Sequence, residues 1–156
     1  MFMRNGNMCI RIFIVITVIF FMYLSEAAGQ FNEVNIEQTK LDNGMTVMYH
    51  EDHSAPVVST VMQYDIGSAA EGKEQRGFAN FMKNLAMGGT ENIPAGKQEK
   101  LLQEVAGSMG NFVSFDRTEF SIRVPSKEVK LALWIEAERM RKLKFDSLNI
   151  ETAREG

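Results

Sequence analysis

Cysteine is almost absent from this 156-residue sequence, in which Cys9 is the only one. Cys9 stands before the longest apolar run of the chain, in a segment with the features of a cleaved leader. If that segment is removed, the rest of the chain has no thiol. Disulfide bonds, cysteine-ligated zinc and a cysteine nucleophile are then excluded.

Strongly basic segments are also lacking. The formal net charge is −3, from 17 Lys and Arg against 20 Asp and Glu, and the sequence has no Lys/Arg-rich run. A protein that binds nucleic acid usually presents clustered positive charge along one face. We therefore expect no nucleic-acid partner.

No apolar run is long enough to cross a bilayer as a helix. The longest, from Ile12 to Leu24, has 13 residues, against the roughly 20 that a spanning helix requires. Arginines precede it, and Ser25 and Ala27 follow with the spacing of a cleavage site. Residues 1–27 are therefore predicted to be a secretory signal peptide, with an uncleaved anchor as the alternative. The protein is expected to be secreted or periplasmic, without a stable membrane span after cleavage.

Histidine is scarce, and both histidines, His50 and His53, lie in the string HEDHSAP. Residues three apart on a strand point to opposite faces, whereas a metal site needs convergent ligands. We interpret the string as a solvated loop at a strand end, with a metal site as the less favoured alternative.

What the sequence does contain is a series of strand and helix patterns. Strands are expected near residues 34–36, 45–49, 57–66, 111–116 and 118–125, and helices at 78–87, 94–106, 127–143 and from 146 onward. This order predicts an α+β fold over residues 28–156, with a mostly antiparallel sheet flanked by helices. The last helix is expected to be cut off, so that the domain is incomplete at its C-terminal end.

Several residues are expected to form turns or to end and begin the helices. Asp42-Asn43-Gly44 is predicted to form the turn between the first two strands, and Gly88 and Gly89 are predicted to end the first helix. Gly107 is predicted to stop the second helix, and Ser126 and Asp146 are predicted to cap the third and the fourth. Trp134, on the third helix, is expected to lie in the core.

Three charged residues, Asp116, Arg117 and Glu119, lie close together around the start of the last predicted strand. They are expected to form an ion-pair cluster that orients the sheet. Exposed pairs contribute only about 0–1 kcal/mol, so we assign this cluster no function.

The first predicted helix, Phe78 to Met87, carries polar residues opposite its apolar stripe. Asn80 and Asn84 are four apart and share one face, with Lys83 beside them. Two histidines at this spacing, with a glutamate at the position of Lys83, would form the H-x-x-E-H zinc motif. The string here is NFMKN. It keeps the spacing and has none of the three chemical groups.

Seven segments, in order along the chain, resemble one family of proteins. They are LDNGMTVMYHEDHSAPVV, YDIGSAAE, RGFANFM, GGTENIPAGK, SFDRTEF, VPSKEVKLALWIEAERM and ETAREG. Together they resemble the N-terminal part of the pitrilysin/insulinase type of inverted-motif zinc metallopeptidases, the group that includes the mitochondrial processing peptidase. The resemblance runs from about residue 41 to the end of the chain.

Members of the family have a zinc site on this helix, but the residues of this chain at the matching positions argue against one here. The zinc histidines of the family fall on Asn80 and Asn84, its catalytic glutamate falls on Lys83, and its third ligand would lie just past Gly156. Asparagine is a poor zinc ligand, and an ammonium group repels a dication and is no base at neutral pH. We therefore expect no cofactor, no metal ligand and no catalytic residue, in a catalytically inactive homologue.

Lys83 admits two interpretations. Its positive charge can replace that of the lost dication beside an acidic surrounding, in which case the Lys83→Glu change should destabilise the fold. Alternatively, position 83 lies on a solvated cleft wall, where the change to lysine has no functional consequence.

The resemblance also implies a peptide-binding strand edge. In the family, the strand after the second helix accepts a peptide as an added strand, and here that edge falls on Gly110, Asn111, Phe112 and Val113. Strand addition uses backbone groups and can survive changes of side chain. A plain sheet edge is the alternative.

Family members often pair an active subunit with one that lacks the motif. The resemblance therefore implies a non-catalytic partner of an active homologous peptidase that handles peptides. A stand-alone peptide-binding module and a non-functional truncated fragment are the alternatives, and an active metalloendopeptidase is the least favoured.

Overall fold

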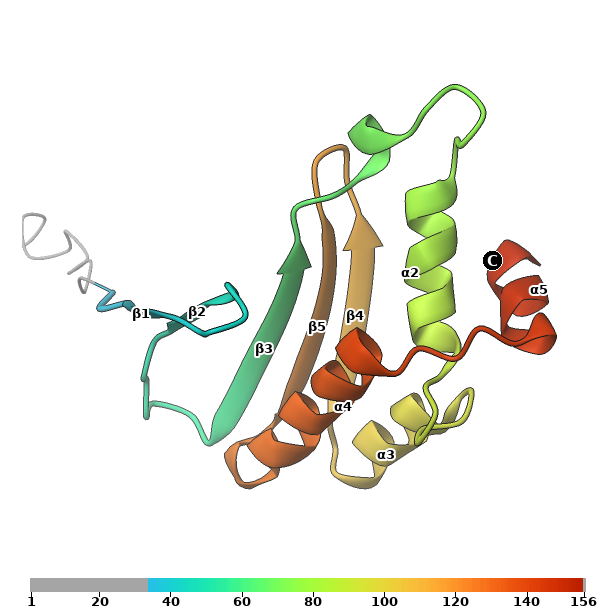
Figure 1. The fold of residues 1–156 in the computed structure, drawn as a ribbon. Coiled ribbons are helices and arrows are strands. Elements are labelled where there is room, and N and C mark those ends of the chain that lie inside the picture. Colours follow the sequence, from blue (N-terminus) through green and yellow to red (C-terminus); the bar gives the residue numbers. More distant parts are fainter. Residues whose placement is uncertain (1–33, 156) are drawn as a thin grey trace, which may run out of the picture. The chain divides into compact units, whose positions relative to one another are not determined.

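The computed structural model describes residues 34–155, and the chain divides after Asp52 into two compact units. In the first unit, β1 (Glu37–Lys40) and β2 (Thr46–Tyr49) form an antiparallel hairpin. The hairpin is visible in Figure 1. The first strand was expected at 34–36 but begins at Glu37, because the turn sets the register: Leu41 N–H donates to Met45 O at 2.9 Å. Pairing then starts directly beyond this turn.

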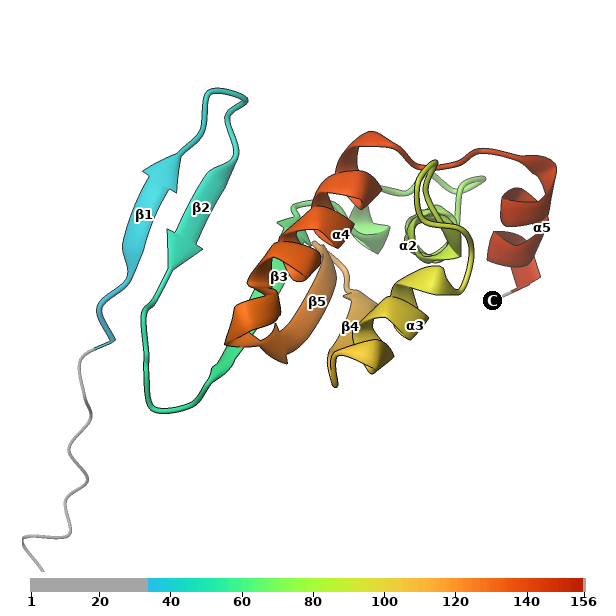
Figure 2. The same cartoon turned by 90° about the horizontal axis from the view of Figure 1, so that it is seen from below.

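The second unit is a three-stranded antiparallel sheet with helices, as the sequence predicted. Its strands are β3 (Val57–Tyr64), β5 (Thr118–Pro125) and β4 (Ser108–Val113), in the spatial order β3-β5-β4. Its helices are α2 (Phe78–Gly88), α3 (Lys97–Glu104), α4 (Val129–Arg141) and α5 (Ser147–Glu155), as Figures 1 and 2 show. Helix α4 contacts β3 and β5, α3 contacts β4, and α2 contacts β4 and α5. Among residues 34–155, no helix combines the length and hydrophobicity needed to span a bilayer.

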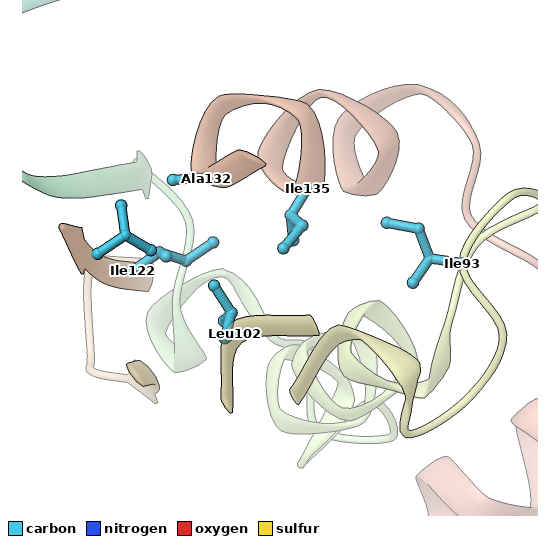
Figure 3. Close-up of a cluster of buried hydrophobic side chains, with 6 residues drawn as sticks. Ile93, Leu102, Ile122, Ala132 and Ile135 are labelled. Carbon is cyan, nitrogen blue, oxygen red and sulfur yellow. The ribbon is translucent and has the colours of Figure 1, made fainter. Parts of the chain in front are cut away.

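One face of β5 forms the centre of the core. Its buried residues alternate with more exposed ones, as the period of a strand requires. The core cluster consists of Ile93, Leu102, Ile122, Val124, Ala132 and Ile135, each at most 1% exposed. Figure 3 shows how α3, α4 and β5 converge there. Burying a large aliphatic side chain contributes about 1.5–3 kcal/mol, so this cluster holds the helices on the sheet.

Helix α3 ends in a Schellman motif, two residues after Glu104. Ala106 N–H donates to Gln103 O at 3.1 Å, and Gly107 N–H donates to Leu102 O at 2.7 Å. The residue in the left-handed conformation is Ala106, with φ of 56°, one residue before Gly107, which was predicted to stop the helix. Gly107 is required for a different reason, because a Cβ there would come within 2.9 Å of Val124 Cγ1.

Replacing Ala106 with glycine should therefore stabilise the protein. An L-residue in the left-handed region costs about 1 kcal/mol, and glycine does not incur this cost. We expect the Ala106→Gly variant to gain about 1 kcal/mol in the free energy of unfolding, measured by urea titration. As the control, Ala137→Gly on the exposed side of α4 should lose about 1 kcal/mol. A loss for both variants would contradict this account.

The starts of α4 and α5 differ from each other. Ser126 does not cap α4, because residues 126–128 form a short 3-10 turn in which no side chain bonds the helix start. Asp146 does cap α5, since its Oδ1 accepts the Asn149 N–H at 2.9 Å. The bonds from Lys144 and Asn149 lower the pKa of the Asp146 carboxyl.

Trp134 is not a core residue. It is 41% exposed, so the sequence-based expectation is wrong. Helix α4 presents Ala132, Ile135 and Arg139 to the interior, and Trp134 lies about 100° around the helix from Ile135.

Candidate functional site

Helix α2 is positioned by a residue that precedes it in the chain. The Glu71 carboxylate accepts the Gly77 N–H on one oxygen and the Ala79 N–H on the other, both at 2.8 Å. These bonds satisfy two of the N–H groups that a helix start leaves without partners. The bond from Ala79, and then that from Gly77, lowers the pKa of Glu71. This cap was not readable from the sequence, because Glu71 lies six residues before Gly77 and reaches it only through the folded loop.

The lowered pKa gives this cap a pH dependence. Its stabilisation is present above the ordinary pKa of a glutamate and is lost as pH falls through the lowered pKa of the folded state. The melting temperature of Glu71→Gln should therefore lie below that of the wild type at about pH 7, and the two should converge toward about pH 3. Thermal melts across this range test it. A difference that does not change with pH would show that the carboxylate is not responsible.

The C-terminal end of α2 agrees with the sequence. Gly89 follows the helix with φ of 130°, and a Cβ there would come within 2.9 Å of Ala95 N and Ile93 O. The glycine therefore allows the chain to fold back closely after the helix.

The structure separates the three motif positions of α2, with the two asparagines toward α5 and the lysine toward another cavity. Asn80 is exposed, in a hollow of about 520 Å³ that is also lined by Phe81, Ala153 and Arg154. Asn84 is half-buried, and its Nδ2 donates to Ala153 O of α5 at 3.2 Å. Lys83 does not line that hollow but a different cavity. The asparagines thus lie toward α5, as two ligands on one helix face would, with Lys83 turned away from them.

These residues do not fit zinc. The amide group of Asn84 is engaged by the backbone of α5, and neither asparagine offers an imidazole or a carboxylate. In the part of the chain that the structure describes, no group of three or more His, Cys, Asp or Glu is arranged to hold a metal ion. The arrangement thus supports no reaction step through a metal at these positions.

Lys83 lies on the wall of a cavity of about 370 Å³, between α2, β3, β5 and the end of α4. The wall is mostly apolar, with Ile66, Phe78, Met82, Phe120, Met140 and Leu143 among its residues. Among residues 34–155, no carboxylate forms an ion pair with the Lys83 ammonium. The structure thus gives no support to the hypothesis that Lys83 compensates an acidic surrounding.

A buried polar cluster adjoins this cavity through Arg139. It consists of Glu136 and Arg139 of α4 and Gln98 of α3. Arg139 Nη1 is 2.7 Å from Glu136 Oε2, and Arg139 Nη2 donates to Gln98 Oε1 at 3.2 Å. The guanidinium carbon of Arg139 also lies 4.5 Å from the ring centroid of Phe120. Within residues 34–155, three buried atoms of this cluster have no hydrogen-bond partner: Gln98 Nε2, Glu136 Oε1 and Arg139 Nε. This cluster was not predicted from the sequence, because its charged residues resemble those of an ordinary polar helix end.

Burial raises the pKa of Glu136, and Arg139 acts against that rise. The folded protein therefore binds this proton more tightly than the unfolded chain does. The resulting stabilisation is complete below the ordinary pKa of a glutamate and is lost as pH rises through the raised pKa of the folded state. Glu136→Gln cannot titrate, so its unfolding free energy relative to the wild type should rise between about pH 4 and pH 7. Urea titrations at each pH measure it, and a constant difference would contradict the raised pKa.

The predicted peptide edge lies on β4. Gly110, Asn111, Phe112 and Val113 pair with β5 on one side, with Gly110 opposite Ser121. On its other side β4 has no strand neighbour within the three-stranded sheet. Helix α2 contacts β4 and runs beside it in Figure 1. The four residues thus form an edge strand next to the motif helix.

The remaining sequence candidates have structural partners. His50 Nδ1 lies 2.7 Å from Asn35 O. Arg117 Nε is 2.7 Å from Glu119 Oε1, whereas Asp116 accepts the Ser114 hydroxyl and lies outside that pair. The predicted ion-pair cluster is therefore a single pair.

Comparisons with known proteins identify the fold and the family. The family model described as Insulinase (Peptidase family M16) matches residues 46–155. Cytochrome b-c1 complex subunit 1 of Rattus norvegicus mitochondria is 26% identical over 115 residues, which cover 74% of this chain and 24% of that protein. The probable mitochondrial-processing peptidase subunit beta of Arabidopsis thaliana is 26% identical over 117 residues, which cover 75% and 22%.

Solved structures agree on the fold. A protease from Helicobacter pylori superposes with a TM-score of 0.75 at 24% identity, over 79% of this chain and 30% of that one. Pitrilysin superposes with a TM-score of 0.72 at 21% identity, over 80% and 13%. The chain spans about a quarter of the length of the curated relatives that it matches. Because the family model covers more than half of it, the chain belongs to the insulinase family of peptidases, family M16.

Proposed function

We propose that this chain is a catalytically inactive member of the family, and that it acts as the non-catalytic partner of an active homologous peptidase that handles peptides. It binds no zinc, and it works in a secreted or periplasmic location after loss of residues 1–27. The observation that carries the proposal is the state of the motif helix. Its fold is kept, while Asn80, Lys83 and Asn84 replace the chemistry, and Asn84 bonds to α5.

A role within a complex accounts for a retained fold without retained chemistry. Two of the relatives are named as subunits, one of a peptidase and one of the cytochrome b-c1 complex. Their names support assembly with other chains as a property to test here. The helix pair α2 and α5 is well packed, with Leu85 fully buried and Ala153 4% exposed. A subunit that contributes shape to a peptide chamber needs this packing and does not need the metal.

Native mass spectrometry of the protein purified from its own source tests the proposal. We expect a complex that contains a second subunit with an intact H-x-x-E-H motif. N-terminal sequencing of the same material should give a chain that begins at Ala28. A free chain that carries stoichiometric zinc and cleaves peptides would overturn the proposal.

A stand-alone peptide-binding module is the second candidate, favoured by the open edge of β4. An extended peptide can add to such an edge through its backbone N–H and C=O groups. Titration of the isolated chain with an extended peptide and with its N-methylated counterpart tests this role. Binding of the first alone would favour the module. A chain that neither assembles, nor binds peptide, nor folds would favour a non-functional fragment.

A further inference from the structure

The cavity beside α2 combines an apolar wall with a positive charge that has no ion-pair partner in the described part of the chain. Its volume of about 370 Å³ lies within the range of about 300–1,000 Å³ in which proteins bind small molecules. Tyr64 and Phe120 stand on one side, in edge-to-face contact with their centroids 6.0 Å apart. Phe78 and Met82 stand on the α2 side.

The charges around this cavity leave one site for an anion. Glu71 lines the wall, but both of its oxygens accept backbone N–H groups of α2. Arg139 also lines the wall, and Glu136 neutralises it at 2.7 Å. Lys83 remains, half-buried and without an ion-pair partner among residues 34–155. A lysine that is drawn toward the interior normally has a partner, because an unpaired charge in apolar surroundings is costly.

Arg139, which also lines the wall, has a donor without an acceptor among residues 34–155. The Nε of Arg139 is buried without a hydrogen-bond partner, and the Arg139 side chain is 1% exposed. This residue contacts the Phe120 ring, which is part of the cavity wall. The cavity thus offers apolar contact for the body of a ligand and the Lys83 ammonium for its head.

We infer that this cavity binds a carboxylate attached to an apolar group, with Lys83 as its counter-ion. The C-terminal residue of a peptide and a free aromatic or aliphatic acid share this chemistry. The site is separate from the β4 edge, and the inference does not depend on the proposed partner role. Lys83 stands where the family has its catalytic glutamate. In this inference, a cation at that position binds the carboxylate of a ligand.

Calorimetric titration of the full chain with 4-phenylbutyrate tests the inference. We expect saturable binding with one site per chain, and at least tenfold weaker binding of the neutral 4-phenylbutanamide. Lys83→Gln should weaken the binding of the acid at least tenfold, and Lys83→Arg should retain it. The matched control is Lys100→Gln on α3, an exposed lysine away from the cavity, which should bind as the wild type does.

A second variant tests the cavity without touching the charge. Ala79 lines the wall, so Ala79→Leu fills part of the space and should abolish binding. Circular dichroism verifies that each variant is folded. The absence of saturable binding to the wild type, or equal affinity in Lys83→Gln, would overturn the inference.

Two peptide probes distinguish the possible sources of the ligand. Gly-Ala-Phe with a free C-terminus and its C-terminal amide are titrated against 4-phenylbutyrate in competition. Displacement by the free peptide alone identifies peptide C-termini as ligands of the site, and displacement by neither restricts it to free acids. Both results support a carboxylate site, whereas equal displacement by the amide contradicts it.

Discussion

Replacing Arg139 with methionine is expected to lower the free energy of unfolding by about 3–5 kcal/mol. The side chains of Arg139 and Glu136 are 1% and 3% exposed, and their charged atoms are 2.7 Å apart. Removing the arginine leaves the Glu136 carboxylate in the interior without its cation. Urea-induced unfolding at neutral pH, followed by circular dichroism, measures the loss.

The chain supplies a matched control for this variant. Glu151 and Arg154 form a pair with the same i, i+3 spacing on α5, at 3.0 Å, but both side chains are 64% exposed. Water screens such a pair, so Arg154→Met should cost at most about 1 kcal/mol. Equal losses for Arg139→Met and Arg154→Met would show that burial does not set the strength of the first pair.

A double variant separates the pair from the cost of an orphaned charge. Replacing a buried ion pair by apolar side chains of similar volume is often neutral or stabilising. Glu136→Leu combined with Arg139→Met should therefore recover most of the stability that Arg139→Met loses. If it does not, the bond from Arg139 to Gln98 contributes more than the ion pair.

Zinc is expected to leave the melting temperature of the wild-type chain unchanged and to raise that of the variant N80H/N84H. Two histidines four apart on one helix face provide the ligand pair that the asparagines lack. With free zinc at 100 times the dissociation constant, binding stabilises the folded state by about 2.7 kcal/mol. Thermal melts with and without zinc measure the effect. Adding a chelator should reverse the shift in melting temperature.

The single variant Asn80→His is the control, since one imidazole does not chelate. It should show a much smaller shift than N80H/N84H. Neither variant is expected to cleave peptides, because Lys83 still stands where the family has its catalytic glutamate. A zinc-dependent shift in the wild type as large as that of N80H/N84H would contradict the assignment of an inactive site.

Local sequence was sufficient to predict the elements and their order. The Asp42-Asn43-Gly44 turn, the helix that ends at Gly88 and Gly89, and the cap from Asp146 were all readable from the sequence. Each depends on a preference of a few neighbouring residues: a positive φ that glycine tolerates, or a carboxylate three residues from an N–H. The family was readable for the same reason, since its motifs are continuous strings.

Predictions of single-residue environments depended on distant parts of the chain. Trp134 is apolar and lies on an amphipathic helix, yet Ile135 faces the core and Trp134 does not. Ser126 has the chemistry of a cap, but the 3-10 turn after Pro125 moves the helix start beyond it. For Trp134, the docking of α4 against β3 and β5 decided which side of the helix is buried.

The sequence by itself determined that Asn80, Lys83 and Asn84 lack the chemical groups of the H-x-x-E-H motif, wherever these residues lie. Only the tertiary structure decided what these residues do instead. Asn84 bonds to α5, 69 positions along the chain, and Lys83 lines a cavity built from α2, two strands and α4. Residue chemistry is a local property, but burial and partners follow from contacts between segments that are distant in sequence. The pairing of Arg139 with Glu136 in the interior likewise exists only after the sheet and α3 have enclosed them.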